Sequence, residues 1–145
     1  MRGISYRLAL PALTTALFLL APGCGSEGAP KRAEAPVVRI SEHDFKIKAP
    51  SRVRAGAVDL AVRNHGPDTH ELIVVRTGNG RLPTRSDGTT INEEAVQHQE
   101  AGALAPGQPG AFRHLRLHLK PGRYELFCNM AGHYFGGMHA RLQVG

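Results

Sequence analysis

The sequence lacks several features that mark common classes of protein. The apolar run from Leu8 to Leu20 is shorter than the roughly 18 residues of a membrane-spanning helix, and Pro11 also interrupts it. No run of Lys and Arg is interleaved with aromatic residues, which argues against a nucleic-acid partner. No long helix is evident. The chain has 145 residues, which is enough for one domain with a core and too short for two ordinary ones.

Cysteine is also scarce, with one residue near each end of the chain. Cys24 and Cys128 stand in very different contexts, so the even number does not by itself imply a disulfide. Each cysteine therefore needs its own explanation.

The first 23 residues predict a signal peptide. A short basic segment precedes an apolar one, and Leu20-Ala21-Pro22-Gly23-Cys24 ends it with small residues. This end resembles a bacterial lipobox, in which the cysteine is diacylated and becomes the mature N-terminus. We therefore expect an exported protein, in the periplasm or on the outer face of the cytoplasmic membrane, anchored by a lipid at Cys24. The alternative is ordinary cleavage that leaves Cys24 as a free thiol.

Residues 24–35 are rich in Gly, Ala, Pro and charge and have no apolar period, so we expect a flexible linker there.

The formal net charge is +6, and the first 23 residues hold two of the 18 basic and none of the 12 acidic residues, so +4 remains for the rest. A mildly basic surface favours an acidic protein partner or an anionic membrane surface. Residues 36–145 form the expected domain, most simply as a monomer.

The domain reads as short strands separated by Gly and Pro turns, which is typical of an all-β sandwich or barrel. The segments expected to form strands are 37–48 with an irregularity at 42–44, one around 58–62, 70–75, 111–120, 124–128 and 138–144. Pro121-Gly122 predicts a type II turn. The segment 77–110 is hard to interpret, and only 92–103 could make a short helix.

A group of possible metal ligands lies near the C-terminus. Cys128, His133 and Met138 follow one another with four residues between each, and a thiolate, an imidazole and a thioether together suit a metal that is stable as both Cu(I) and Cu(II). Residues two apart on a strand share a face. This places Cys128, Met138 and the upstream His70 on core-facing positions at strand ends, where they can converge.

These residues resemble the cupredoxin family of small blue-copper electron carriers. The resemblance covers residues 36–145 and rests on an Asn64-x-Gly66 turn before His70, on Pro121-Gly122-x-Tyr124 leading into Cys128, and on the loop to Met138. The loop spacing is similar to that of the rusticyanin and sulfocyanin branch. The resemblance implies a Greek-key β-sandwich with one type 1 copper, bound by His70, Cys128 and His133 and, weakly, by Met138.

Other residues compete for these roles. Met130 could replace Met138, His139 could replace His133, and His65 could replace His70, but each is less well placed by spacing or strand parity. Glu71 departs from the family pattern, in which Asn, Ser or Thr is more usual, and strand parity turns it away from the face of His70.

The expected function is transfer of single electrons between protein redox partners, some of them membrane-associated. We expect no enzyme, because a Cys128/His133 nucleophile pair has no third member to orient it. We expect electrons to pass at the edge of His133, within an apolar patch formed by Tyr134 and Phe135. The alternative function is a copper-binding module for storage, delivery or resistance, and zinc is the alternative metal, although a thioether is not among its usual ligands.

Overall fold

A computed structural model describes residues 34–78 and 80–145. The predicted signal peptide, Cys24 and residues 25–33 of the predicted linker lie outside this described part. Among the described residues, no helix has both the length and the hydropathy needed to span a bilayer.

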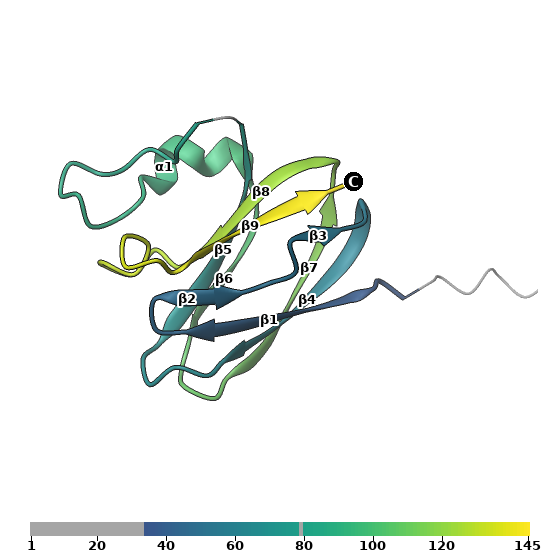
Figure 1. The fold of residues 1–145 in the computed structure, drawn as a ribbon, viewed down its shortest axis with the longest axis horizontal. Helices are drawn as coiled ribbons and strands as arrows, with labels where there is room; N and C mark the ends of the chain where they lie inside the picture. Colours follow the sequence, from purple (N-terminus) through teal and green to yellow (C-terminus); the bar gives the residue numbers. More distant parts are fainter. Residues whose placement is uncertain (1–33, 79) are drawn as a thin grey trace, which may run out of the picture. The chain divides into compact units, whose positions relative to one another are not determined.

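The described domain is a sandwich of two sheets (Figure 1). One sheet has four strands in the order β2-β1-β4-β7, and the other has five in the order β3-β9-β8-β5-β6. Their bounds are β1 (Val37–His43), β2 (Lys46–Lys48), β3 (Arg52–Val53), β4 (Gly56–Asn64), β5 (His70–Thr77), β6 (Glu100–Gly107), β7 (Phe112–Leu119), β8 (Gly122–Phe127) and β9 (His139–Val144). The predicted all-β sandwich is confirmed.

The core between the sheets is built by alternate residues of the strands. On β4 the inward residues are Val58, Leu60 and Val62, and none of them is more than 1 % exposed. They pack in one cluster with Leu72 and Leu126 from the facing sheet. The predicted inward registers are therefore the observed ones.

Strand β5 is apolar on both faces because it contributes to two cores. Leu72 and Val74 face the core between the sheets, whereas Ile73 and Val75 pack in a second cluster on the other side of the sheet. That second cluster includes Ile91 and other residues of the segment between β5 and β6. The second core explains why a strand of this sheet needs no polar face.

The helix prediction for 92–103 is wrong in its second half. Helix α1 (Glu93–Val96) continues into a 3₁₀ turn (Gln97–Gln99), and from Glu100 onward the chain is strand β6, paired antiparallel with β5. Gly102 and Pro106 disfavour a helix there, and pairing with the edge of β5 gives the segment its backbone hydrogen bonds.

Two turns also differ from expectation. The irregularity at 42–44 is the end of β1, and the chain reverses at Asp44 and Phe45 so that β1 and β2 pair antiparallel. At Pro121-Gly122 the chain crosses from β7 to β8 in the other sheet, and the φ of Gly122 is 149°, far from the roughly +80° of a type II turn.

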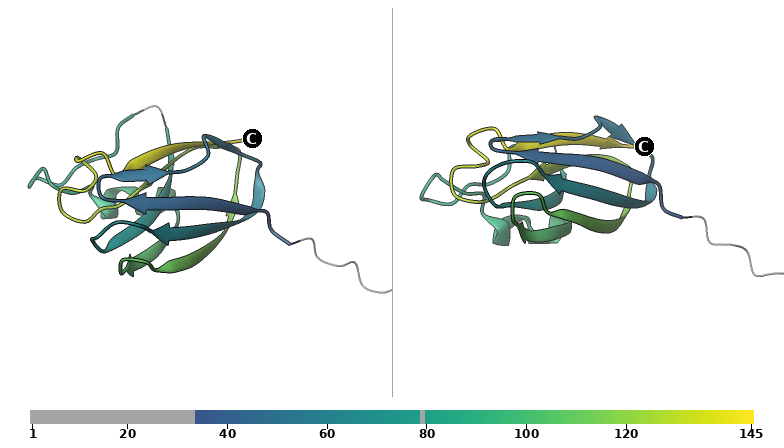
Figure 2. Two further views of the ribbon diagram at one scale, coloured as in Figure 1. Left: turned by 60° about the horizontal axis from the view of Figure 1, so that its bottom comes forward. Right: turned by 90° about the horizontal axis from the view of Figure 1, so that it is seen from below.

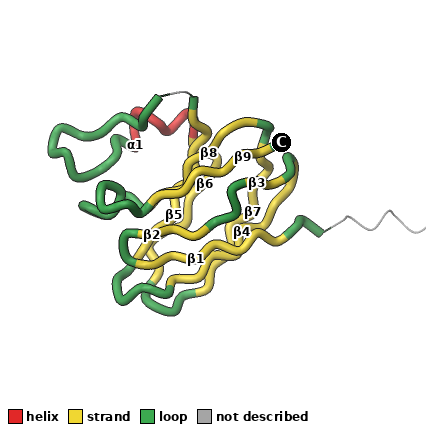
Figure 3. The backbone as a smooth tube through the Cα atoms, in the orientation of Figure 1, coloured by secondary structure: helices red, strands yellow, loops and turns green. Residues whose placement is uncertain are grey.

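The loops between strands gather at the two ends of the sandwich (Figure 3). The loop before β9 lies at the end opposite to the start of β1, and both further views in Figure 2 show the same separation. The turn between β1 and β2 and the connection from β4 to β5 also lie at the end that holds the loop before β9. This end carries the candidate ligands.

Candidate metal centre

His70 is placed by the turn between β4 and β5. The side-chain amide of Asn64 donates to the carbonyl of Asp68 at 2.7 Å and to that of Gly107 at 3.0 Å, and its oxygen accepts the N–H of Gly66 at 2.9 Å. These three bonds fix the turn so that His70 begins β5 with its side chain in the core, where the residue is 0 % exposed. The Asn64-x-Gly66 pattern therefore positions His70.

Cys128 follows β8 directly and lies beside His70 because β8 pairs antiparallel with β5. The loop from Cys128 back to β9 is closed by backbone hydrogen bonds. The N–H of Cys128 donates to the carbonyl of Met138 at 3.1 Å, and the N–H of Met138 donates to the carbonyl of His133 at 2.9 Å. One short loop thus brings Cys128, His133 and Met138 together.

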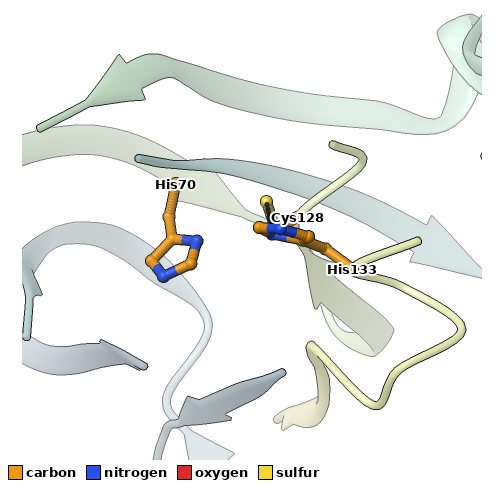
Figure 4. Close-up of side chains that lie close together, drawn as sticks. All are labelled: His70, Cys128 and His133. Carbon is orange, nitrogen blue, oxygen red and sulfur yellow. Dashed lines mark hydrogen bonds between the residues drawn. The ribbon is translucent and has the colours of Figure 1, made fainter. Parts of the chain in front are cut away.

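Three of the predicted ligands converge from these separate elements. One possible ligand atom from each of His70, Cys128 and His133 lies within 4.8 Å of the others, and the Cys128 sulfur is 3.5 Å from His133 Nδ1. Figure 4 shows the His70 side chain approaching from one side and those of Cys128 and His133 from the other. Met138 is also fully buried and packs in the same core cluster as Cys128.

Burial shifts the pKa values of His70 and Cys128. Burial lowers the pKa of His70, and its hydrogen bond to Asp44 opposes that shift. Burial raises the pKa of Cys128, whereas the backbone N–H groups of Glu71 and Met130, which donate to its sulfur, lower it. Hydrogen bonds from these donors favour the charged form of the sulfur, whereas burial disfavours it.

The residues fit a copper ion. His70 Nδ1 is buried without any hydrogen-bond partner, which is costly for a polar atom unless a metal occupies that direction. Two imidazoles, a thiolate and a nearby thioether are the donor set of a blue-copper site. Zinc would leave the buried thioether of Met138 without a role.

Known structures agree with this fold. No family model and no curated protein matches the sequence, but a search of solved structures finds many similar chains. Among them is reduced auracyanin from Roseiflexus castenholzii, with 16 % identity and a TM-score of 0.57, where the match covers 78 % of this chain and 99 % of that one. Auracyanin A, a "blue" copper protein from Chloroflexus aurantiacus, has 15 % identity, a TM-score of 0.57 and coverages of 77 % and 100 %. Rusticyanin from Thiobacillus ferrooxidans has 14 % identity, a TM-score of 0.56 and coverages of 77 % and 79 %. All three are cupredoxins. The chain has the cupredoxin fold.

Within this cupredoxin fold the competing residues lie elsewhere. His65 is exposed in the turn and stacks on His43, with ring centroids 5.2 Å apart. His139 points away from the cluster, and its Nδ1 lies 3.3 Å from a carboxylate oxygen of Glu125. Met130 is only partly buried, at the edge of the core. The convergence of His70, Cys128 and His133 follows the sequence prediction.

The predicted aromatic patch is only partly correct. Phe135 is 50 % exposed, but the Tyr134 hydroxyl donates to Glu125 at 2.9 Å and its ring packs against Phe127. Burial and this carboxylate raise the pKa of Tyr134 to about 12. The second exposed aromatic near the site is Phe45, also 50 % exposed, whose ring centroid lies 5.4 Å from that of His133.

Glu71 has a bracing role. Its carboxylate accepts the N–H of Asn129 at 3.1 Å, so it holds the residue next to Cys128 rather than facing the ligands. The side chain of Asn129 in turn bonds Ile91 and Glu93, which links the loop to the residue before the N-cap of α1 and to the first residue of α1. Burial and the nearby carboxylate of Glu93 raise the pKa of Glu71. Sequence reasoning foresaw the outward direction of Glu71 but missed Asn129.

Gly136 provides a test of how tightly the loop packs. A Cβ at this position would overlap the ring of Phe45. We expect Gly136→Ala to lower the free energy of unfolding of the metal-free protein by about 1–3 kcal/mol, as overpacking does. The same substitution should cost much less in a Phe45→Ala background, because the overlapping ring is gone. Urea unfolding of the four proteins measures the coupling, and equal losses in both backgrounds would contradict the contact.

Proposed function

We propose that this protein is a blue-copper electron carrier that moves single electrons between protein partners. The observation that carries the proposal is the enclosed group of His70, Cys128 and His133, with an unpartnered imidazole nitrogen and a buried thioether beside it. The cupredoxin fold supports it, since this fold places that group at one end of a rigid sandwich.

The ligand roles in this proposal follow the donor types. His70, Cys128 and His133 would hold the ion as strong ligands, and Met138 would be the weak axial ligand. When bound, copper supplies a one-electron couple between Cu(I) and Cu(II). The chain supplies the rest, because the backbone hydrogen bonds that close the loop hold the donors in one arrangement for both oxidation states.

Access to the site supports a carrier over an enzyme. The Cys128 thiol is 0 % exposed, which suits a metal ligand better than a nucleophile that must reach a substrate. His133 is only partly buried, and the exposed Phe45 ring lies beside it. We propose that this rim, formed by Phe45, His133 and Phe135, is where a redox partner docks.

The same burial disfavours the alternative of a copper-delivery protein. An acceptor that takes Cu(I) must reach the ligands in turn, and both His70 and Cys128 are fully enclosed by the core. Retention of the metal through many redox cycles is the property expected of this arrangement.

We also propose that the protein is exported and anchored by a lipid at Cys24. The support is the basic and then apolar start of the sequence, the small residues before Cys24, and the polar segment that follows. Such an anchor would hold the copper domain near membrane-associated partners.

The proposed copper site can be tested by colour. Purified protein with Cu(II) added should show intense visible absorption from the thiolate-to-copper transition, and Cys128→Ser should abolish it while the fold persists by circular dichroism. A colourless copper complex of the unmodified protein would overturn the proposal. Rapid loss of Cu(I) to a chelating acceptor, without reversible redox cycling, would favour delivery instead.

The axial role of Met138 has its own test. Met138→Leu removes the thioether, which disfavours Cu(II), so the reduction potential should rise by about 60 mV or more, equivalent to a tenfold change in relative affinity. Met130→Leu is the matched control and should leave the potential unchanged. A lowered potential in Met138→Leu, or an equal rise in the control, would exclude Met138 as the axial ligand.

Membrane attachment is tested by fractionation. The unmodified protein expressed in a bacterial host should sediment with membranes, and Cys24→Ser should release it into the soluble exported fraction. Equal distribution of the two proteins would show that Cys24 anchors nothing.

A further inference from the structure

The turn between β1 and β2 contacts both histidines of the site from outside. It consists of Asp44 and Phe45. One carboxylate oxygen of Asp44 lies 3.0 Å from His70 Nε2, and the Phe45 ring meets the His133 ring edge-on. Neither residue offers an atom to the group of candidate ligands.

The contact with Asp44 determines how the His70 imidazole can be used. The two ring nitrogens have different environments, because Nε2 faces the carboxylate and Nδ1 is buried without a partner. A metal bound at Nδ1 requires the proton on Nε2, where it donates to Asp44 Oδ1. A carboxylate that accepts this bond makes the imidazole a more basic ligand and fixes the plane of its ring.

Gly66 leaves room for the contact between Asp44 and His70. A Cβ at Gly66 would overlap Asp44 Oδ1 and would lie 2.7 Å from His70 Nε2. The absence of a side chain at Gly66 therefore lets the carboxylate and the imidazole meet. The turn that contains Gly66 is the one that Asn64 holds in place.

Phe45 keeps the turn against the site. Its φ is 57°, a left-handed conformation that is rare for an aromatic residue. Its ring packs over His133 and fills the space that a side chain at Gly136 would take. The turn is thus fixed on one side by His70 and on the other by the loop before β9.

We propose that Asp44 is a positioning residue that holds His70 through Nε2 and lowers the reduction potential of the bound copper by favouring Cu(II). The inference rests on the proposed copper function. It adds a determinant of the potential that comes from the first hairpin of the domain, far in sequence from the loop that carries three of the ligands.

A second acidic residue separates the effect of a carboxylate in direct contact with the ring from that of a more distant charge. Asp68 also acts on His70 by its charge, but its side chain is exposed and makes no hydrogen bond to the ring. Exposed charges are screened by solvent. Asp68→Asn therefore removes the same charge as Asp44→Asn, but from a residue that does not contact the ring.

The test measures the potential of the copper-loaded protein by spectroelectrochemical titration. Asp44→Asn retains an acceptor oxygen and loses the charge. We expect it to reduce the Cu(II) affinity relative to Cu(I) about tenfold, which corresponds to a rise of about 59 mV, with the visible spectrum retained. Asp68→Asn should shift the potential by a small fraction of that amount.

A third variant tests the positioning role. Asp44→Ala removes the acceptor as well, so the His70 ring should lose its fixed plane. The copper hyperfine splitting in the electron paramagnetic resonance spectrum should then change. Copper should also dissociate faster than from Asp44→Asn. Blue proteins with equal potentials for Asp44→Asn and Asp68→Asn, or with a lowered potential for Asp44→Asn, would overturn the inference. An unmodified protein that never turns blue would overturn the copper function itself, so the two failures are distinguishable.

Discussion

The pairing of β5 with β8 is the constraint on which the site depends. Its antiparallel register places Ile73 opposite Phe127 and Val74 opposite Leu126, so His70 and Cys128 emerge on the same face at the same end of the sheet. A slip of one residue would turn one of them into the second core, away from its partner. The apolar residues on the two faces of β5 pack in two separate clusters, so such a slip would also remove each of them from its cluster. The packing that stabilises the sandwich therefore also aligns the ligands.

Several buried polar side chains of the domain form ion pairs or hydrogen bonds. Glu42 is fully buried beside Arg113, at 2.6 Å, and burial raises the pKa of Glu42 while the guanidinium lowers it. The carboxylate of Glu71 accepts the N–H of Asn129, the residue after Cys128, and the Asn129 side chain donates to the carbonyl of Ile91. These bonds constrain the backbone near the sulfur without approaching the ligand atoms. Under the proposed electron-transfer function, such fixed surroundings would help the site change charge without changing its geometry.

The sequence predicts those parts of the molecule that depend on short-range patterns. Alternation along β4, β7 and β8 identifies the core faces, because residues two apart on a strand share a face. The spacing of Cys128, His133 and Met138 identifies the loop through the chemistry of these side chains. The reversal at Asp44 was mistaken for an irregularity within one strand, since Phe45 is a poor residue for a left-handed turn and only its packing over His133 explains it. Strand β6 was missed for a similar reason. Its hydrogen bonds come from β5, which is distant in sequence, and its own residues carry no strand pattern.

The direction of β1 gives the domain two distinct ends. The strand starts at the end remote from the ligands and finishes next to Asp44, and its seven residues span about 23 Å at the usual rise per residue. The described chain therefore enters the domain at one end, and the candidate ligands lie at the other. Under the proposed attachment through Cys24, a domain with this polarity would pivot about the point where the chain enters and would still present the same end to a partner.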